Sequence, residues 1–203
     1  TSSGCDWSSD VCSSDLVRYL TNESSGKQGY EIALALNKLG FKTKLITGPS
    51  NIIHQNDIKT IKVITAEEMF SEVKKSLPVD VAICAAAVSD FKPKKKNNKK
   101  FKKKDNNLLT IELEKNKDIL ENLGKNNRHR PKLVVDFAAE TENLNRNSIL
   151  KMKKKNCDII IANDISKKDI GFNSDYNKVS MIDSSGNANL IKKNKKSFIA
   201  NKI

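Results

Sequence analysis

Three short apolar runs constrain the fold of this chain more than any other feature. They are DVAICAAA at 80–87, KLVVDFA at 132–138 and DIIIA at 158–162. Continuous runs of this kind are typical of strands that are buried on both faces of a parallel sheet. Helical patterns lie before or between these runs, at 66–77, 116–123 and 145–155. The sequence therefore predicts an α/β domain. Farther along, the runs 177–182 and 188–191 predict a hairpin.

A glycine-containing turn before the first helical pattern predicts an anion site. Residues 17–21 alternate as a strand, small and polar residues follow, and a helical pattern runs over 30–39 with Gly40 as its C-cap. The first N–H groups of a helix have no partner within it, and the helix dipole favours a negative charge there. We therefore expect a phosphate or carboxylate at the turn of Ser24, Ser25, Gly26 and Lys27.

This turn matches neither of the common phosphate fingerprints, GxxxxGKS/T and GxGxxG. An ordinary strand-to-helix turn is therefore the alternative. The run at 41–47 reads as the next strand. A strand, helix and strand in succession predict that 41–47 pairs in parallel with 17–21 through a right-handed crossover.

Charged side chains gather near the ends of the predicted strands. Asp90 follows the run at 80–87, and ligands of open α/β sheets collect at the carboxyl ends of strands, although Asp90 could also be a capping residue. The lysine-dense loop 92–104 is either an anion-binding segment or a solvated low-complexity insert. Lys151 and Lys155 are four apart and share one helix face, which could hold phosphates or serve only solubility.

Composition narrows the class of protein further. The 203 residues suffice for one α/β domain, and the net charge of +13 would suggest a polyanionic partner. Lysine and asparagine are abundant throughout and aromatic residues are few, which argues against nucleic acid as the partner. The four cysteines form no CxxC pair, so no zinc site or disulfide framework is indicated. Since no apolar run approaches the roughly 20 residues of a membrane span, we expect a cytoplasmic protein.

Residues 1–16 differ from the rest of the chain. They hold no lysine, contain SSD twice and include two of the four cysteines. We expect this segment to be a non-native tail or an artefact, the alternative being a disordered polar tail. The domain is then expected at 17–203, with truncation at either end left open.

Several motifs together resemble a known enzyme family. TNESSGKQG, AAAVSDFKP, the lysine loop, EKNKDIL, VVDFAAET, KMKKKNCDIIIANDIS and FNSDYNKVSMID occur in this order. Their order and spacing are similar to those of phosphopantothenoylcysteine synthetase, the synthetase half of a bifunctional decarboxylase/synthetase of coenzyme A biosynthesis. The resemblance implies a Rossmann-like three-layer fold with a mainly parallel sheet, acting as a homodimer that is fused to, or works with, a flavin-dependent decarboxylase domain.

The resemblance also implies a reaction. The carboxylate of 4'-phosphopantothenate would attack the α-phosphate of CTP, pyrophosphate would leave, and the amine of cysteine would displace CMP from the acyl-cytidylate. A polyanionic nucleotide calls for lysines and a divalent cation, so CTP, Mg²⁺ and the two substrates are the expected ligands. No FMN is expected here, because the decarboxylase half is not in this sequence.

Residue by residue, the resemblance implies three catalytic side chains, Lys100, Asn22 and Arg18. Lys102 and Lys103 are alternatives to Lys100, since the register of the lysine loop is open. The nucleotide-binding positions that it implies are Ala85, Ala86, Ala87, Asp90, Lys100, Lys117, Asp118, Ile119, Leu120, Phe137, Lys151 and Lys155. Asp90 is also the candidate metal ligand.

The chain departs from the family pattern at two of these motifs, and two other classes of function remain. Lys117 stands where the family usually has proline, and Asp136 replaces the usual glycine before Phe137. An NAD(P)-binding Rossmann oxidoreductase would need a tighter glycine fingerprint and an acidic residue at the end of the second strand, near Thr47. A basic nucleic-acid-binding module would explain the charge but not the residues at the end of the 80–87 strand.

Overall fold

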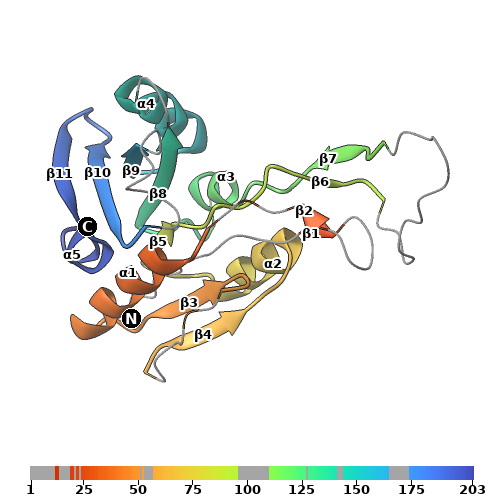
Figure 1. The fold of residues 1–203 in the computed structure, drawn as a ribbon, viewed down its shortest axis with the longest axis horizontal. Coiled ribbons are helices and arrows are strands. Elements are labelled where there is room, and N and C mark those ends of the chain that lie inside the picture. The colour runs from red at the N-terminus through yellow and green to blue at the C-terminus, as the bar shows by residue number, and fades with distance from the viewer. Residues whose placement is uncertain are drawn as a thin grey trace.

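The centre of the fold is a five-stranded mixed sheet (Figure 1). The computed structural model describes residues 12–13, 19–20, 22, 24–50, 52, 57–95, 110–126, 128–140, 144–164 and 174–203. The strand order is β11-β10-β9-β8-β5, with β5 at Val81–Cys84, β8 at Leu133–Glu140, β9 at Ile159–Asp164, β10 at Tyr176–Asp183 and β11 at Ala188–Lys195. The strands β5, β8 and β9 run parallel to one another, and β10 is antiparallel to both of its neighbours, β9 and β11. The predicted α/β class and C-terminal hairpin are confirmed.

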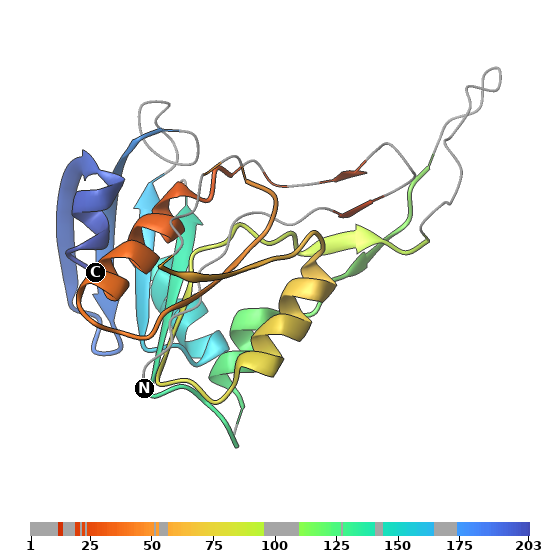
Figure 2. The ribbon, with the colours of Figure 1, turned by 90° about the horizontal axis from the view of Figure 1, so that it is seen from below.

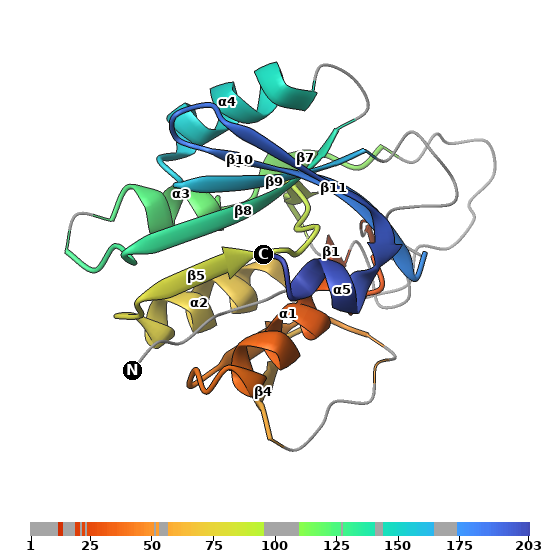
Figure 3. The same cartoon turned by 90° about the vertical axis from the view of Figure 1, so that its left-hand side faces the viewer.

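Alternate residues of the sheet pack into two different cores. Val134 and Ile160 face the core formed with α2 at Ala66–Ser76, α3 at Ile119–Gly124 and α4 at Leu144–Lys155. Their neighbours Val135 and Ile161 face the core formed with α1 at Lys27–Lys38 and α5 at Lys196–Ala200. Because successive side chains of a strand point to opposite faces, apolar residues at every position need a helix layer on each side. The two helix layers cover opposite faces of the sheet (Figure 3).

The starts of the helices differ in how they are capped. Thr65 and Glu68 form a capping box at α2, and the Asp118 side chain accepts the N–H of Glu121 at α3. The helix α1 begins at Lys27, three residues before the predicted start, after Gly26 in the left-handed conformation with φ of 70°. No side chain caps α1. The N-terminus of α1 instead lines a cavity, where an anion could accept its N–H groups.

One predicted pairing is wrong. The strands β2 at Tyr19–Leu20 and β3 at Lys44–Thr47 were expected to pair with each other. Instead, β2 pairs antiparallel with β1 at Cys12–Ser13, and β3 pairs parallel with β4 at Lys59–Lys62. The reason is that α1 packs against the large sheet on one side and against β3 on the other. Ile32 faces the large sheet, whereas Ala33 packs on Leu45 of β3. The helix thus lies between the large sheet and β3, a placement that local periodicity does not specify.

A two-stranded arm extends from the body of the molecule. It pairs β6 at Phe91–Pro93 with β7 at Leu113–Lys115 in antiparallel register (Figures 1 and 2). Most of the lysine-dense loop, 96–104, lies outside the described residues. Within the part of the chain that the structure describes, no helix combines the length and apolarity that a membrane crossing requires.

The contact between α3 and α4 depends on a glycine. A Cβ at Gly124 would lie 2.0 Å from the carbonyl oxygen of Lys155 and 2.7 Å from that of Asn156. The Asn156 side chain also donates a hydrogen bond of 2.7 Å to the Gly124 carbonyl. We predict that Gly124→Ala lowers the free energy of unfolding by about 3 kcal/mol, because backbone rather than a flexible side chain must move.

Gly40→Ala is the matched control. Gly40 has open space around it and a φ of 85°, so the substitution there should cost only about 1 kcal/mol of backbone strain. Urea denaturation of both variants measures the difference. Equal losses would contradict the close packing of α3 on α4.

Candidate functional site

Two cavities adjoin at the edge of the sheet where the parallel strands end. A small one, of about 90 Å³, is lined by the N-terminus of α1 and is called the turn cavity. A large one, of about 690 Å³, lies beside α3 and α4. Ala86 and Phe137 line both. The predicted turn and the predicted lysine face therefore meet at one place.

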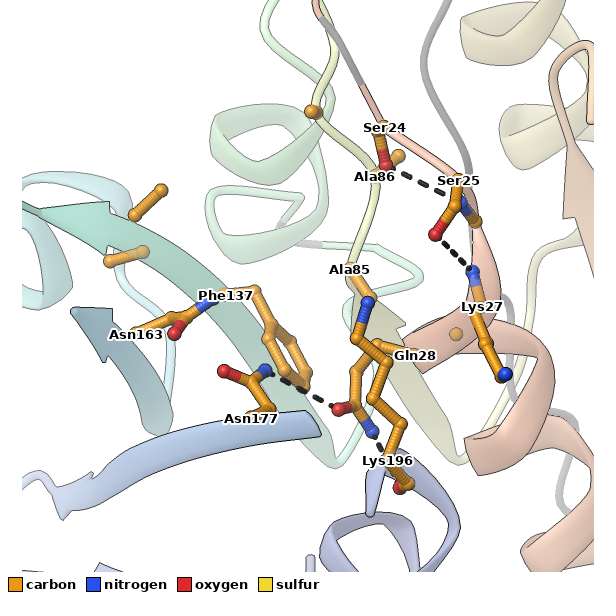
Figure 4. A pocket seen from close by; sticks show the side chains of 15 residues that line it. Ser24, Ser25, Lys27, Gln28, Ala85, Ala86, Phe137, Asn163, Asn177 and Lys196 are labelled. Atoms are coloured by element: carbon orange, nitrogen blue, oxygen red, sulfur yellow. Dashed lines mark hydrogen bonds between the residues drawn. The ribbon is translucent and has the colours of Figure 1, made fainter. Parts of the chain in front are cut away.

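The turn cavity contains the whole predicted turn. Ser24, Ser25, Gly26 and Lys27 line it, together with Ala85, Ala86 and Ala87 from the segment after β5. The N–H groups of Gly26 and Lys27 donate long hydrogen bonds of 3.4 Å to the hydroxyls of Ser24 and Ser25. Bonds of this length are weak, so a phosphate oxygen could replace them. The Lys27 amine lies 2.5 Å from Asp175 and points away from the cavity (Figure 4).

Four polar residues of the turn cavity were missed by the sequence analysis. They are Gln28, Asn163, Asn177 and Lys196. The Gln28 side chain donates to the Lys196 carbonyl at 3.2 Å and accepts from Asn177 at 3.4 Å (Figure 4). Asn163 directly follows the DIIIA strand, so its position at a strand end could have indicated it. Asn177 and Lys196 come from the hairpin and α5, and nothing local singles them out.

The large cavity contains most of the predicted nucleotide positions. Asp90 and Lys117 line it, as do Asp118, Ile119 and Leu120 at the start of α3, Phe137 of β8, and Lys151 and Lys155 of α4. Asp90 lies at the exposed base of the arm, where its carbonyl accepts the N–H of Asn116 at 2.9 Å. Ala85 and Ala87 line only the turn cavity.

Carboxylates hold several lysines of the large cavity in place. Lys155 contacts Asp118 and lies 2.8 Å from Glu121, and these two carboxylates outweigh the effect of burial and raise the pKa of Lys155. Hydrogen bonds from Lys125 and then Lys155 lower the pKa of Glu121 to about 2. Lys117 lies 2.5 Å from Glu67 and 5.3 Å from the ring centre of Phe70. Such pairs orient ammonium groups before a phosphate arrives.

The most buried of these pairs joins Lys151 to Asp136. Lys151 Nζ lies 2.7 Å from Asp136 Oδ2, and Asp136 is only 5% exposed. Burial raises the pKa of Asp136, against the opposing charge of Lys151, and Asp118 adds to the rise. Burial alone would lower the pKa of Lys151, but the charge of Asp136 reverses this and raises it. Lys151 therefore remains an ammonium group at the wall of the cavity.

Of the predicted catalytic residues, the structure describes Asn22. The Asn22 side chain donates a hydrogen bond of 3.1 Å to the carbonyl of Ala87, which joins the segment before the turn to the segment after β5. Arg18 and Lys100, with its alternatives Lys102 and Lys103, lie outside the described residues. Among the residues that the structure describes, no group of three or more His, Cys, Asp or Glu side chains could hold a metal ion.

Comparisons with known proteins agree on one family. Residues 11–203 match the family described as the DNA/pantothenate metabolism flavoprotein C-terminal domain. The Coenzyme A biosynthesis bifunctional protein CoaBC of Vibrio parahaemolyticus is 40% identical over 169 residues, which are 82% of this chain and 42% of that protein. The chain spans less than half the length of the curated relatives that it matches.

Solved structures share the fold. The crystal structure of the C-terminal domain of a Coenzyme A biosynthesis bifunctional protein CoaBC superposes with a TM-score of 0.82 at 30% identity, covering 99% of this chain and 91% of that one. A mutant of Cab2 in complex with phosphopantothenate-cysteine has a TM-score of 0.76 at 13% identity, covering 98% of this chain and 83% of that one. The second likeness is one of fold alone.

The Lys151–Asp136 pair yields a prediction with a definite pH dependence. Lys151→Met should lower the free energy of unfolding by about 3 kcal/mol at pH 8, because a buried carboxylate loses its partner. The folded-state pKa of Asp136 would then lie still farther above its unfolded value. A carboxyl with a raised pKa destabilises the fold above that pKa, and the loss is relieved as the pH falls through it.

The measurement is urea denaturation of Lys151→Met at pH 8 and at pH 5, where the loss should be smaller. Lys153→Met, an exposed lysine of the same helix, is the control and should change stability little at either pH. A loss in Lys151→Met that is the same at both pH values would contradict the burial of a charged Asp136.

Proposed function

Because this chain belongs to the family of the DNA/pantothenate metabolism flavoprotein C-terminal domain, we propose that it ligates cysteine to 4'-phosphopantothenate at the expense of CTP. The observation that carries the proposal is the meeting of the turn cavity and the large cavity at Ala86 and Phe137. One end of the combined site suits a phosphate, and the other presents several lysines. The name of the CoaBC relatives and the ligand of the Cab2 structure support the same reaction.

The proposed chemistry has two steps. A carboxylate oxygen of phosphopantothenate attacks the α-phosphorus of CTP, the bond to the β-phosphate oxygen breaks, and pyrophosphate leaves with its electron pair. The cysteine amine then attacks the acyl carbon, CMP leaves, and the amine loses a proton as the amide forms. The first step is needed because a free carboxylate has no adequate leaving group. Each step places extra negative charge on phosphate oxygens, which fixed cations and N–H donors stabilise.

The sizes of the cavities suggest how the ligands divide between them. The volume of the turn cavity, about 90 Å³, is well below the roughly 300–1,000 Å³ of most small-molecule pockets, and it suits a phosphate group. The large cavity, at about 690 Å³, has room for a nucleoside or a pantothenate chain. We therefore place nucleotide phosphates at Ser24–Lys27 and assign Asp90, Asp118–Leu120, Phe137, Lys151 and Lys155 to the remainder of the ligands.

One of the proposed catalytic residues lies beside the turn cavity. Asn22 is held at the Ala87 carbonyl, and an amide there can hydrogen-bond the acyl-cytidylate without adding charge. Lys100 would contact the triphosphate, and Arg18 would act near the acyl-cytidylate. Mg²⁺ is commonly held by one or two carboxylates together with substrate phosphates, so Asp90 fits as a ligand only of an ion that the nucleotide also coordinates.

The remaining expectations about the assembly form part of the proposal. We propose a homodimer that works with a flavin-dependent decarboxylase domain, as the bifunctional names of the relatives suggest. We place the enzyme in the cytoplasm. Residues 17–203 form the proposed synthetase domain, and 1–16 the proposed non-native tail.

The decisive assay measures pyrophosphate release by the 203-residue chain. With CTP and Mg²⁺ present, we expect release only when 4'-phosphopantothenate is added, because its carboxylate is the nucleophile. Addition of cysteine should then yield CMP and the amide product, which mass spectrometry detects. Pyrophosphate release that ignores phosphopantothenate, or no release at all, would argue against the ligase.

Variants of the lysine loop test the catalytic cation. Lys100→Gln should slow pyrophosphate release by a barrier increase of about 2–4 kcal/mol if this amine stabilises the triphosphate in the transition state. Lys102→Gln and Lys103→Gln serve as comparisons within the same loop. If one of these slows the reaction in place of Lys100→Gln, the catalytic role moves to that residue. Unchanged rates in all three would remove the loop from the mechanism.

A further inference from the structure

We infer that Lys196 is a further cation of the phosphate site, with its ammonium group facing the nucleotide phosphates held at Ser24–Lys27. The inference rests on the proposed function and extends it to a residue for which neither the sequence motifs nor the family resemblance assigns a role. It also implies that nucleotide binding is coupled to the uptake of a proton.

The position of Lys196 is fixed from both sides of its backbone. Its N–H donates to the carbonyl of Asp175 at 3.0 Å, and its own carbonyl accepts the Gln28 side chain at 3.2 Å. The residue is only 3% exposed, and it lines the turn cavity. Its side chain extends past Gln28 in the direction of Ala85 (Figure 4). The amine therefore approaches the same space as the predicted turn.

The lysine within the turn does not fill this role. Lys27 is half-buried, and its amine is engaged by the exposed carboxylate of Asp175 at 2.5 Å. In Figure 4 it points away from Gln28 and Phe137. A phosphate at the turn would thus meet the helix N-terminus and the serine hydroxyls, with a buried ammonium supplied by Lys196 at the start of α5.

The surroundings of Lys196 make its charge costly when no ligand is bound. Burial, followed by the charge of Lys27, lowers the pKa of Lys196 to about 8, and Asp175 opposes the shift only weakly. Phe137, Asn163 and Asn177, which line the cavity with it, carry no charge. A phosphate beside the amine would favour its charged form and offset the cost of burial.

A second observation in the same cavity also points to a ligand. Asn163 is 8% exposed, and among the described residues its Oδ1 atom has no hydrogen-bond partner although it is buried. A buried acceptor without a donor is unfavourable by roughly 1–3 kcal/mol. A hydroxyl group of a ligand beside the phosphate would provide the missing donor. An ammonium and an open acceptor in one small cavity thus fit a phosphate ester that carries a hydroxyl group nearby better than a simple inorganic anion.

Proton uptake follows from the position of this pKa. At pH 8 about half of the Lys196 side chains are neutral in the free protein, and a phosphate beside the amine favours the charged form. Binding of the nucleotide should therefore take up about half a proton at this pH. The effect should fade toward pH 6.5, where the amine is already charged.

The test compares Lys196→Met with Lys195→Met by calorimetric titration with CTP. Lys195 is the exposed neighbour, which makes it the matched control. We expect Lys196→Met to bind CTP roughly 10- to 100-fold more weakly, the equivalent of one charge-assisted hydrogen bond, and Lys195→Met to bind as the unchanged chain does. Methionine fills similar space without the buried charge, so the melting temperature should hold or rise.

Titration at pH 8 in two buffers with different ionisation enthalpies measures the protons taken up. The difference between the unchanged chain and Lys196→Met should be about half a proton, because ionisation of the nucleotide is common to both. If the unchanged chain binds CTP but Lys196→Met binds equally well or takes up as many protons, the role of Lys196 is refuted and the ligase proposal stands. If the unchanged chain does not bind CTP, both proposals fail.

Discussion

The parallel pairing of β5, β8 and β9 is the constraint on which the rest of the molecule depends. Pairing in register places the ends of these strands at one edge of the sheet, so that Ala85, Phe137 and Asn163 become neighbours although the chain separates them widely. The helix α1 packs on the same sheet through Ile32 and brings its uncapped N-terminus to that edge. The N–H donors of α1, the segment after β5 and the lysines of α4 and α5 can then contact one ligand.

The lysines of the two cavities differ in how their positive charge is balanced. In the large cavity two lysines of α4 are balanced by acidic partners, Lys151 by Asp136 and Lys155 by Asp118 and Glu121. These amines remain charged and oriented before a nucleotide arrives. In the turn cavity Lys196 faces mostly uncharged groups, and its charge depends on pH. The same edge of the sheet thus combines permanent cations with one whose charge, we propose, responds to a ligand.

The contacts of Asp136 explain one departure of this chain from the family pattern. In the sequence it appeared only as a replacement of the usual glycine before Phe137. In the structure its carboxylate is buried under the cavity and contacts the amine of Lys151. The substitution therefore brings a partner for a lysine of the proposed nucleotide site and changes the electrostatics around it.

Local patterns in the sequence determined the order and type of the main elements. Apolar runs indicated the buried strands, Thr65 and Glu68 mark the start of α2, and Gly26 and Ser24 pointed to the turn, because caps, turns and periodicities act over a few residues. The tertiary structure decided which strands pair, so that β3 joins β4 rather than β2. It also decided which of many lysines line a cavity, and Lys196 and Asn177 reach the turn cavity only through the packing of α5 and the hairpin. Such contacts depend on residues far apart in the chain, and in a sequence this rich in lysine no local signal separates a buried amine from a solvated one.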